Sequence, residues 1–249
     1  MAKTAIITGA SAGIGAQVAI DLAKQGLNVV LLARRVELCE KLVKEGKIAE
    51  SQALCLKCDV TNYDDVAKAV EAAEKKWADS PIDLMVNNAG LMALNTVENQ
   101  PLKDVTTMLN VNIAGVINGV KAVVKAMKKG GQGTIVNVSS IAGIKPFPNH
   151  TVYCGTKYAV HGITQGLRHE LRTDNIRVMV CAPGAVMTDL LKTSNSQETV
   201  DGYKQWLENC GGEMLRSEDV SASILFAYNM PQRVCIRNIE LAGTTQDDI

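Results

Sequence analysis

Apolar residues along the chain alternate between two spacings, one typical of buried strands and one typical of the helices that cover them. Short, almost continuously apolar runs fit strands that are buried on both faces. Between them lie helical segments such as Asp64 to Trp77, in which Val66, Val70 and Ala73 recur on one face. The strand-like runs are residues 5–8, 29–33, 53–58, 84–87, 134–138, 178–182 and 234–241. The pattern predicts an α/β fold: a doubly wound, Rossmann-like, seven-stranded parallel sheet with helices on both faces.

One stretch breaks this rhythm. Residues 187–212 are polar and rich in Ser, Asn, Thr and Gly, and they lie between the sixth strand and the next helix. Long irregular segments in compact domains are usually binding loops or lids. We therefore expect a mobile substrate lid at about 187–212.

Composition narrows the class of protein further. With 249 residues, 47% of them apolar, the chain is long enough for one compact domain over residues 1–249. Lys+Arg and Asp+Glu both number 26, so no net charge attracts nucleic acid or a membrane surface. The N-terminus has no leader-like apolar run, no later run is expected to approach a membrane span, and a soluble cytoplasmic protein is expected.

The number and distribution of the cysteines agree with the expected cytoplasmic location. They number 7, an odd count, and are scattered, which favours reduced thiols over a disulfide framework. Cys55 and Cys58 form a C-x-x-C pair, but they lie in a strand-like run, where residues three apart point to opposite faces. With no second pair or histidine cluster, no metal site is expected.

A glycine-rich turn follows the first strand and opens a helix. It reads Thr8-Gly9-Ala10-Ser11-Ala12-Gly13-Ile14-Gly15. Glycines let backbone N–H groups and the helix N-terminus approach a pyrophosphate, where the helix dipole favours an anion. The alternative interpretation is a tight turn that uses glycine only for its positive φ. The spacing differs from G-x-G-x-x-G, so the turn alone does not decide between them.

The end of the second strand indicates which dinucleotide binds. NAD-binding folds usually carry an acidic residue there for the ribose 2′-hydroxyl, whereas arginine accommodates the 2′-phosphate of NADP. Here the strand ends in Ala33-Arg34-Arg35. Guanidinium groups form charge-assisted, often bidentate bonds to phosphate. NADP(H) is therefore favoured, the alternative being a solvated arginine pair that opens the next helix.

Candidate catalytic residues gather at the same edge of the predicted sheet. Tyr153 and Lys157 are four residues apart in a helical stretch, which places them side by side. A nearby ammonium favours the phenolate, so we expect the pKa of Tyr153 to fall from about 10 toward working pH. Ser140 and the run 87–90 (Asn-Asn-Ala-Gly) end neighbouring strands, at the edge where open α/β sheets bind ligands.

Taken together, these motifs resemble the short-chain dehydrogenase/reductase family over essentially the whole chain. The matching set is T-G-x-x-x-G-x-G at 8–15, Asp59-Val60, the Asn-Asn-Ala-Gly run at 87–90, Asn112, Ser140, Tyr153 with Lys157, and Pro183-Gly184 with Thr188. The resemblance implies a hydride transfer between the nicotinamide and a secondary alcohol or ketone, or a related aldehyde. It also suggests a homodimer or homotetramer.

The resemblance further implies roles for single residues. Tyr153 would exchange the proton with the substrate oxygen, Ser140 would hydrogen-bond that oxygen, Lys157 would hold the nicotinamide ribose, and Asn112 would position a water in a proton relay. Asp59 and Val60 would border the adenine, Asn87 and Gly90 the adenosine ribose, and Pro183 to Thr188 the nicotinamide. The implied cofactor-binding set is Gly9, Ser11, Gly13, Ile14, Gly15, Arg34, Arg35, Asp59, Val60, Asn87, Ala89, Gly90, Tyr153, Lys157, Pro183, Gly184, Val186 and Thr188.

The C-terminal run 234–246 resembles the branch with NADP-dependent 3-hydroxy acid and serine dehydrogenases and farnesol dehydrogenase-like enzymes, although Ala242-Gly243 stands where that branch often has proline. A small 3-hydroxy acid or a terpenoid alcohol is therefore expected as substrate. The alternatives are a hydroxysteroid dehydrogenase and a non-catalytic NADP(H)-binding sensor. In the expected lid, Lys192 is a candidate partner for a carboxylate, whereas Trp206 and its apolar neighbours would suit a terpenoid or steroid. His150, Lys192, Lys204 and Trp206 also fit ordinary surface roles.

Overall fold

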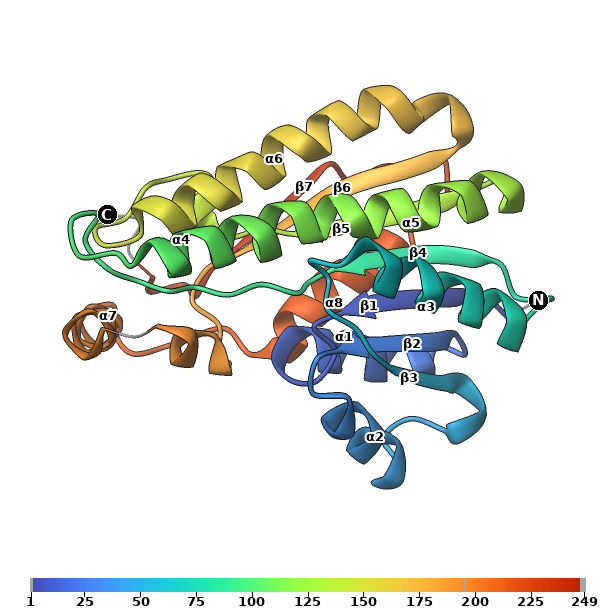
Figure 1. Ribbon diagram of the computed structural model, residues 1–249, viewed down its shortest axis with the longest axis horizontal. Coiled ribbons are helices and arrows are strands. Elements are labelled where there is room, and N and C mark those ends of the chain that lie inside the picture. Colours follow the sequence, from blue (N-terminus) through green and yellow to red (C-terminus); the bar gives the residue numbers. More distant parts are fainter. Residues whose placement is uncertain (1, 195, 247–249) are drawn as a thin grey trace.

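Seven strands pair in parallel into one sheet in the computed structural model, which describes residues 2–194 and 196–246 (Figure 1). Their order is β3-β2-β1-β4-β5-β6-β7, and every neighbouring pair is parallel. The predicted doubly wound sheet is confirmed. The strands are β1 Thr4–Thr8, β2 Asn28–Ala33, β3 Ala53–Lys57, β4 Ile82–Asn87, β5 Gly133–Val138, β6 Ile176–Pro183 and β7 Asn238–Leu241.

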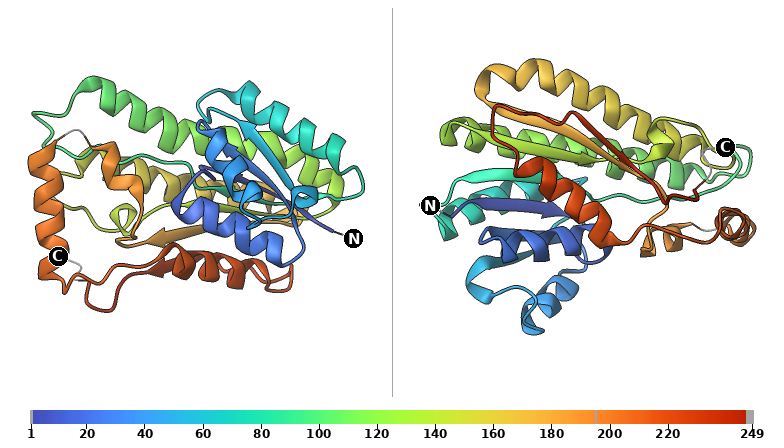
Figure 2. Two further views of the ribbon diagram at one scale, coloured as in Figure 1. Left: turned by 90° about the horizontal axis from the view of Figure 1, so that it is seen from below. Right: turned by 180° about the vertical axis from the view of Figure 1, so that it is seen from behind.

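Helices cover both faces of the sheet. The cluster on one face joins the sheet to α3, α5 and the end of α6, and the cluster on the other joins it to α1, α2 and α8. Figure 2 shows α1 and α8 together on the face opposite α5. The helices are α1 Gly13–Lys24, α2 Val36–Lys44, α3 Tyr63–Lys76, α4 Leu102–Leu109, α5 Gly115–Gly130, α6 Thr151–Leu171, α7 Gln197–Asn209 and α8 Ser217–Tyr228. Since both faces are covered, every residue of β1, β2, β4, β5 and β6 is buried.

The chain reverses its direction of travel across the sheet between β1 and β4. From β1 it moves outward to β2 and β3, then returns to the far side of β1 as β4 and continues outward to β7. Ligands of open α/β sheets bind at such a switch point, outside the carboxyl ends of the strands. The topology therefore fixes the place where the functional residues meet.

The last strand is shorter than the sequence pattern predicts. It begins at Asn238 rather than Val234. Two of the preceding carbonyls are bound by side chains, because the Arg177 guanidinium donates to the Val234 carbonyl at 3.0 Å and Arg168 donates to that of Arg237. The Arg237 carbonyl also accepts from the Val180 N–H at 3.0 Å, so the backbone bonds to β6 begin only there.

The expectation of an irregular segment at 187–212 is wrong. It contains a 3₁₀ turn, Asp189–Thr193, and the helix α7. Ser196 caps that helix, since its hydroxyl accepts from the Thr199 backbone N–H at 3.3 Å, and Gly211 and Gly212 follow its end with positive φ. Figure 1 shows α7 apart from the helices of the two layers, beyond the carboxyl edge of the sheet.

The expectation that no run approaches a membrane span is also too strong. The continuous helix Leu102–Gly130, which includes α4 and α5, is long and apolar enough to cross a membrane by length and composition. Val116, Val120, Val123 and Met127 bury one side of it in the fold. A core helix with a buried apolar face passes the same test, so this finding is weak evidence for a span.

Candidate active site

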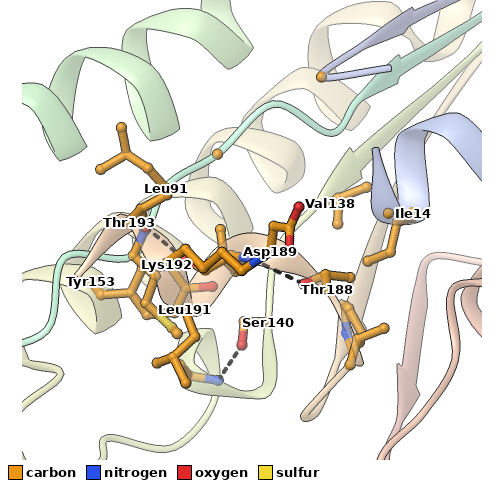
Figure 3. Close-up of a pocket in the computed structure, with 18 of the residues that line it drawn as sticks. Ile14, Leu91, Val138, Ser140, Tyr153, Thr188, Asp189, Leu191, Lys192 and Thr193 are labelled. Atoms are coloured by element: carbon orange, nitrogen blue, oxygen red, sulfur yellow. Dashed lines mark hydrogen bonds and ion pairs between the residues drawn. The ribbon is translucent and has the colours of Figure 1, made fainter. Parts of the chain in front are cut away.

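A pocket of about 1200 Å³ lies at the carboxyl edge, where the switch point of the topology predicts a ligand site. It has two parts. The glycine-loop half is lined by the turn at 9–14, by Arg34 and Arg35, by 58–60 and by 88–90. The aromatic half is lined by 147–150, by 190–193 and by α7 residues 202–207. Figure 3 shows Tyr153, Leu91 and Leu191 toward one end of the pocket and Ile14 and Thr188 toward the other.

The glycine turn forms a cradle that only glycine fits. Gly9 and Gly13 have φ values of 66° and 57°, and a Cβ on Gly9 would lie 2.9 Å from the Ala89 Cα. No side chain caps the first turn of α1 and no acidic residue lies in it, so its N–H groups face the pocket without a competing anion. These features fit a pyrophosphate. Gly15 does not line the pocket, since a Cβ there would lie 2.5 Å from the Gly9 carbonyl oxygen, and it serves close packing instead.

Arg34 and Arg35 stand where the second strand opens toward the pocket. Both line it and both are exposed, and neither forms an ion pair within residues 2–194 and 196–246. Asp59 and Val60 line the same half, and the Asp59 carboxylate accepts from the Thr61 N–H and hydroxyl at 3.0 and 2.8 Å. Two guanidinium groups at this position fit a ribose phosphate.

The candidate proton donor lies where the two halves meet. The Tyr153 hydroxyl and the Ser140 side chain line the pocket together, and the Ser140 oxygen accepts from the Ala142 N–H at 3.1 Å. Lys157 is buried behind them, with Nζ 5.6 Å from the centre of the Tyr153 ring and donating to the Val138 carbonyl at 3.0 Å. The spacing along α6 thus places the tyrosine and the lysine side by side, and the turn after β5 brings the serine to them.

The expected fall in the pKa of Tyr153 is wrong for the protein without cofactor. Burial of the hydroxyl raises its pKa above the ordinary value, because it penalises the phenolate more than the nearby Ser140 hydroxyl favours it. Burial also lowers the pKa of Lys157 to about 8. Tyr153 is therefore held in its protonated form, ready to donate.

Asn112 lies outside the pocket and supports one wall of it through hydrogen bonds. It lies in a π-helical turn, Asn110–Ala114, between α4 and α5. Its side-chain amide donates to the Leu91 carbonyl at 2.9 Å and to the Thr156 hydroxyl at 3.1 Å, while its oxygen accepts from the Leu91 N–H at 3.0 Å. The side chain fixes Leu91, which lines the pocket, against α6.

Asn87 does not border the pocket either, contrary to what the resemblance implies. It is buried under α5, and its amide donates to the Asn137 side-chain oxygen at 2.8 Å. The next residue, Asn88, lines the pocket and donates to the Thr8 carbonyl at 3.0 Å, which ties the glycine turn to β4. Alternating side chains on a strand place one of two neighbouring asparagines inward and the other at the edge.

The turn after β6 carries a partner that sequence reasoning missed. Pro183, Gly184, Val186 and Thr188 all line the pocket. The Gln246 side-chain oxygen accepts from the Ala185 N–H at 2.8 Å, and a Cβ on Gly184 would lie 2.4 Å from that oxygen. Gln246 therefore fixes this turn from the C-terminal segment. The only signal in the sequence is a polar residue close after the last strand.

The segment expected to be a lid is docked on the pocket. The Met92 N–H donates to the Thr193 hydroxyl at 2.8 Å, and the Leu94 N–H donates to the Ser194 hydroxyl at 3.1 Å. Lys192 and Lys204 line the pocket, but both are exposed and pair with Asp189 and Asp201 at 2.6 and 3.5 Å. Movement of the segment stays a prediction.

Aromatic rings form the wall of the aromatic half. Tyr203 and Trp206 of α7 lie with ring centres 5.3 Å apart, and Phe147 lies 6.2 Å from Trp206. His150, which also fits a plain surface role by sequence, lies 5.9 Å from Tyr203 and 6.3 Å from Tyr153. Among the wall residues Phe147, His150, Tyr203 and Trp206, sequence reasoning named His150 and Trp206 as candidates. Within the described part of the chain, no group of three His, Cys, Asp or Glu residues is placed to hold a metal.

Comparisons with known proteins agree with this geometry. Farnesol dehydrogenase of Aedes aegypti is 35% identical, covering 96% of this chain and 95% of its own length. The NADP-dependent 3-hydroxy acid dehydrogenase of Schizosaccharomyces pombe is 36% identical, covering 94% and 90%. Among solved structures, a closed form of serine dehydrogenase complexed with NADP⁺ superposes with a TM-score of 0.88 at 27% identity, covering 98% and 96%.

The family follows from the same comparisons. The sequence pattern of the family described as short chain dehydrogenase matches residues 3–199, which contain the glycine turn and Ser140, Tyr153 and Lys157. Relatives that share a third of the sequence align over nearly their full length. The chain is an oxidoreductase of the short chain dehydrogenase family.

Proposed function

We propose that this protein is an NADP(H)-dependent alcohol dehydrogenase or carbonyl reductase, which interconverts a secondary alcohol and a ketone or a related aldehyde. The observation that carries the proposal is the protonated Tyr153 hydroxyl, which lies with Ser140 and Lys157 where the two halves of the pocket meet. A proton donor beside a dinucleotide cradle is what carbonyl reduction requires.

Each of these residues has its own role in the proposed reaction. The bound cofactor supplies or accepts the hydride. In reduction, the Tyr153 hydroxyl donates its proton to the substrate oxygen, and the Ser140 hydroxyl hydrogen-bonds the same oxygen and stabilises its developing charge. The Lys157 ammonium then stabilises the phenolate that Tyr153 leaves. Asn112 holds Leu91 in the pocket wall against α6, because its amide bonds both Leu91 and Thr156.

The choice of NADP(H) over NAD(H) rests on Arg34 and Arg35. Both guanidinium groups are exposed at the pocket, at the strand end where an acidic residue would repel a ribose phosphate. A related enzyme is described as NADP-dependent and a solved relative is complexed with NADP⁺. The expected cofactor-binding set, apart from Asn87 and Gly15, lines the pocket.

The names of the relatives supply the candidate substrates. One acts on 3-hydroxy acids and one on farnesol, a terpenoid alcohol. Either fits a pocket of about 1200 Å³ that must also hold the dinucleotide. A hydroxysteroid is the alternative, favoured by the aromatic wall.

The assembly and location that we propose are a cytoplasmic homodimer or homotetramer with one domain per chain. Exposed apolar side chains support self-association: Leu109 and Ile117 on the α4–α5 helix are 44% and 46% exposed, and Phe226 on α8 is 64% exposed. Light scattering of the purified protein tests the oligomer.

NADPH consumption against a panel of carbonyl compounds tests the activity. The panel comprises small ketones, β-keto acids, semialdehydes, terpenoid aldehydes and oxosteroids, each also run with NADH. We expect turnover of at least one class, faster with NADPH. Tight NADPH binding without turnover of any class would favour the sensor instead.

A further inference from the structure

The aromatic half of the pocket has a chemical character that neither the fold nor the family decides. Phe147 and His150 come from the segment before α6, and Tyr203 and Trp206 come from α7, about fifty residues later in the sequence. Leu190 and Leu191 pack against the same cluster as Tyr153. Aromatic and aliphatic side chains therefore reach from this side of the site to the proton donor.

No free cation faces the substrate in this half. Among residues 2–194 and 196–246, the lysines that line it are Lys192 and Lys204, both exposed and both paired with an aspartate on their own helical turn. His150 does not supply a charge either. Its Nδ1 lies 2.6 Å from the Pro148 carbonyl oxygen and must carry the proton, so Nε2 of the neutral ring offers a lone pair. Burial also lowers the pKa of His150, which favours the neutral form.

The polar groups that remain are neutral donors. Burial raises the pKa of Tyr203 to about 12, so its hydroxyl stays protonated. The indole N–H of Trp206 is buried and has no hydrogen-bond partner in the described chain. A carboxylate placed here would lose its hydration without gaining a counter-ion. A neutral acceptor oxygen would be accommodated.

The arrangement of the rings also argues against a site for an organic cation. Cages for quaternary ammonium groups turn several ring faces toward one central space. Here the rings pack on one another, with centres 5.3 to 6.2 Å apart from Tyr203 through Trp206 to Phe147, and so form a continuous wall.

We infer that the substrate is an uncharged ketone or secondary alcohol whose apolar skeleton lies against the wall of Phe147, His150, Tyr203 and Trp206, and that free carboxylates are poor substrates. The inference rests on the proposed carbonyl reductase activity and narrows it. It chooses between the two substrates suggested by the relatives, favouring the terpenoid-like class over the hydroxy acid.

Three matched pairs of ketones test the inference by kcat/KM with NADPH. Acetoacetate and its methyl ester differ in the anion. A ketone that ends in tert-butyl and its isostere that ends in trimethylammonium differ in the cation. Butanone and benzylacetone differ in an apolar ring. We expect the ester, the tert-butyl ketone and benzylacetone to be favoured by at least about tenfold each.

Variants of α7 test whether the preference for apolar ketones arises from the aromatic wall. Trp206→Ala and Tyr203→Ala should reduce kcat/KM for benzylacetone about tenfold and change that for butanone less than about twofold. Glu208→Ala, on the same helix but outside the pocket, is the control. NADPH affinity, titrated for each variant, should be unchanged, and Trp206→Phe replaces Trp206→Ala if the latter does not fold.

Each outcome decides one of the two proposals. Preference for acetoacetate or for the trimethylammonium ketone overturns the inference and leaves the proposed function standing. Equal loss on both ketones in the α7 variants also overturns it. If no ketone or aldehyde is reduced while NADPH binds, the proposed function itself is wrong.

Discussion

The two halves of the pocket are built in different ways. The glycine-loop half consists of strand ends and the short turns that follow them, so each functional group sits within a few residues of a buried strand. The aromatic half joins the start of α6 to α7, and hydrogen bonds from Met92 and Leu94 to Thr193 and Ser194 connect segments about a hundred residues apart. One half is specified by local turn chemistry, and the other exists only after the chain has folded.

The difference predicts which changes affect which function. Changes in the glycine-loop half should alter cofactor affinity, and changes in the aromatic half should alter substrate choice. Ser140, Tyr153 and Lys157 lie between them and should affect turnover on every substrate. The following experiments test this division, from the largest expected effect to the smallest.

Tyr153→Phe removes the proton donor and leaves the ring in place. We expect turnover to fall by about 10³-fold on every substrate, with NADPH affinity nearly unchanged. Tyr158→Phe is the matched control, because Tyr158 lies on the same helix, does not line the pocket and donates to the Ile144 carbonyl. Near-normal turnover of Tyr153→Phe would show that Tyr153 is not the proton donor.

Replacement of both Arg34 and Arg35 by Ala should weaken NADPH binding about 10- to 100-fold, because charge-assisted bonds to the phosphate are lost. NADH binding should change little. Lys44→Ala removes an exposed charge from α2 away from the pocket and serves as the control. Fluorescence titration measures both affinities, and equal weakening of NADH would show that the arginines act on the fold instead.

The pH dependence follows from Lys157. Burial lowers its pKa to about 8, so the ammonium is present below that pH and is lost above it. We expect kcat/KM for NADPH, which reports the free enzyme, to be level up to about pH 8 and to fall about tenfold per unit above it. In Lys157→Arg, whatever activity remains should not show this fall, since guanidinium stays charged. A level wild-type profile up to pH 10 would refute the assignment.

Gln246→Ala tests whether the C-terminal segment supports the turn at Gly184. Loss of one neutral hydrogen bond should lower kcat about threefold, with little change in substrate KM. Gln246→Glu keeps the acceptor for Ala185 and should restore part of the loss. Gln52→Ala removes two side-chain bonds far from the pocket, to Ala23 and Leu27. If both alanine variants lose the same activity, Gln246 contributes only stability.

Sequence patterns predicted the sheet well because its determinants are local. Short apolar runs between turn residues are typical of parallel strands that are buried on both faces, and Ser140 and Tyr153 lie at ends of elements that share one edge. The same logic found the glycine turn and the arginine pair. It could not separate Asn87 from Asn88, because only the register of β4 decides which side chain turns inward.

The remaining errors have tertiary causes. α7 is polar, and few of its own residues are buried: Thr199 is buried, and Tyr203 packs against a cluster formed by other segments. Its own sequence therefore resembles a loop. Arg168 and Arg177, both distant in the sequence, donate to backbone carbonyls in the segment just before the last strand. The raised pKa of Tyr153 reflects burial by residues that are distant in the sequence. None of these contacts can be recognised from the spacing of residues along the sequence.

The position of α7 beyond the edge of the sheet bears on how such an enzyme diversifies. Since Tyr203 and Trp206 of this helix line the aromatic half of the pocket, and since other elements form the glycine-loop half, we expect mutations in α7 to leave cofactor binding intact. A lineage can therefore acquire a new substrate by drift in one peripheral helix. Descendants of one ancestor would then share a cofactor while consuming different alcohols.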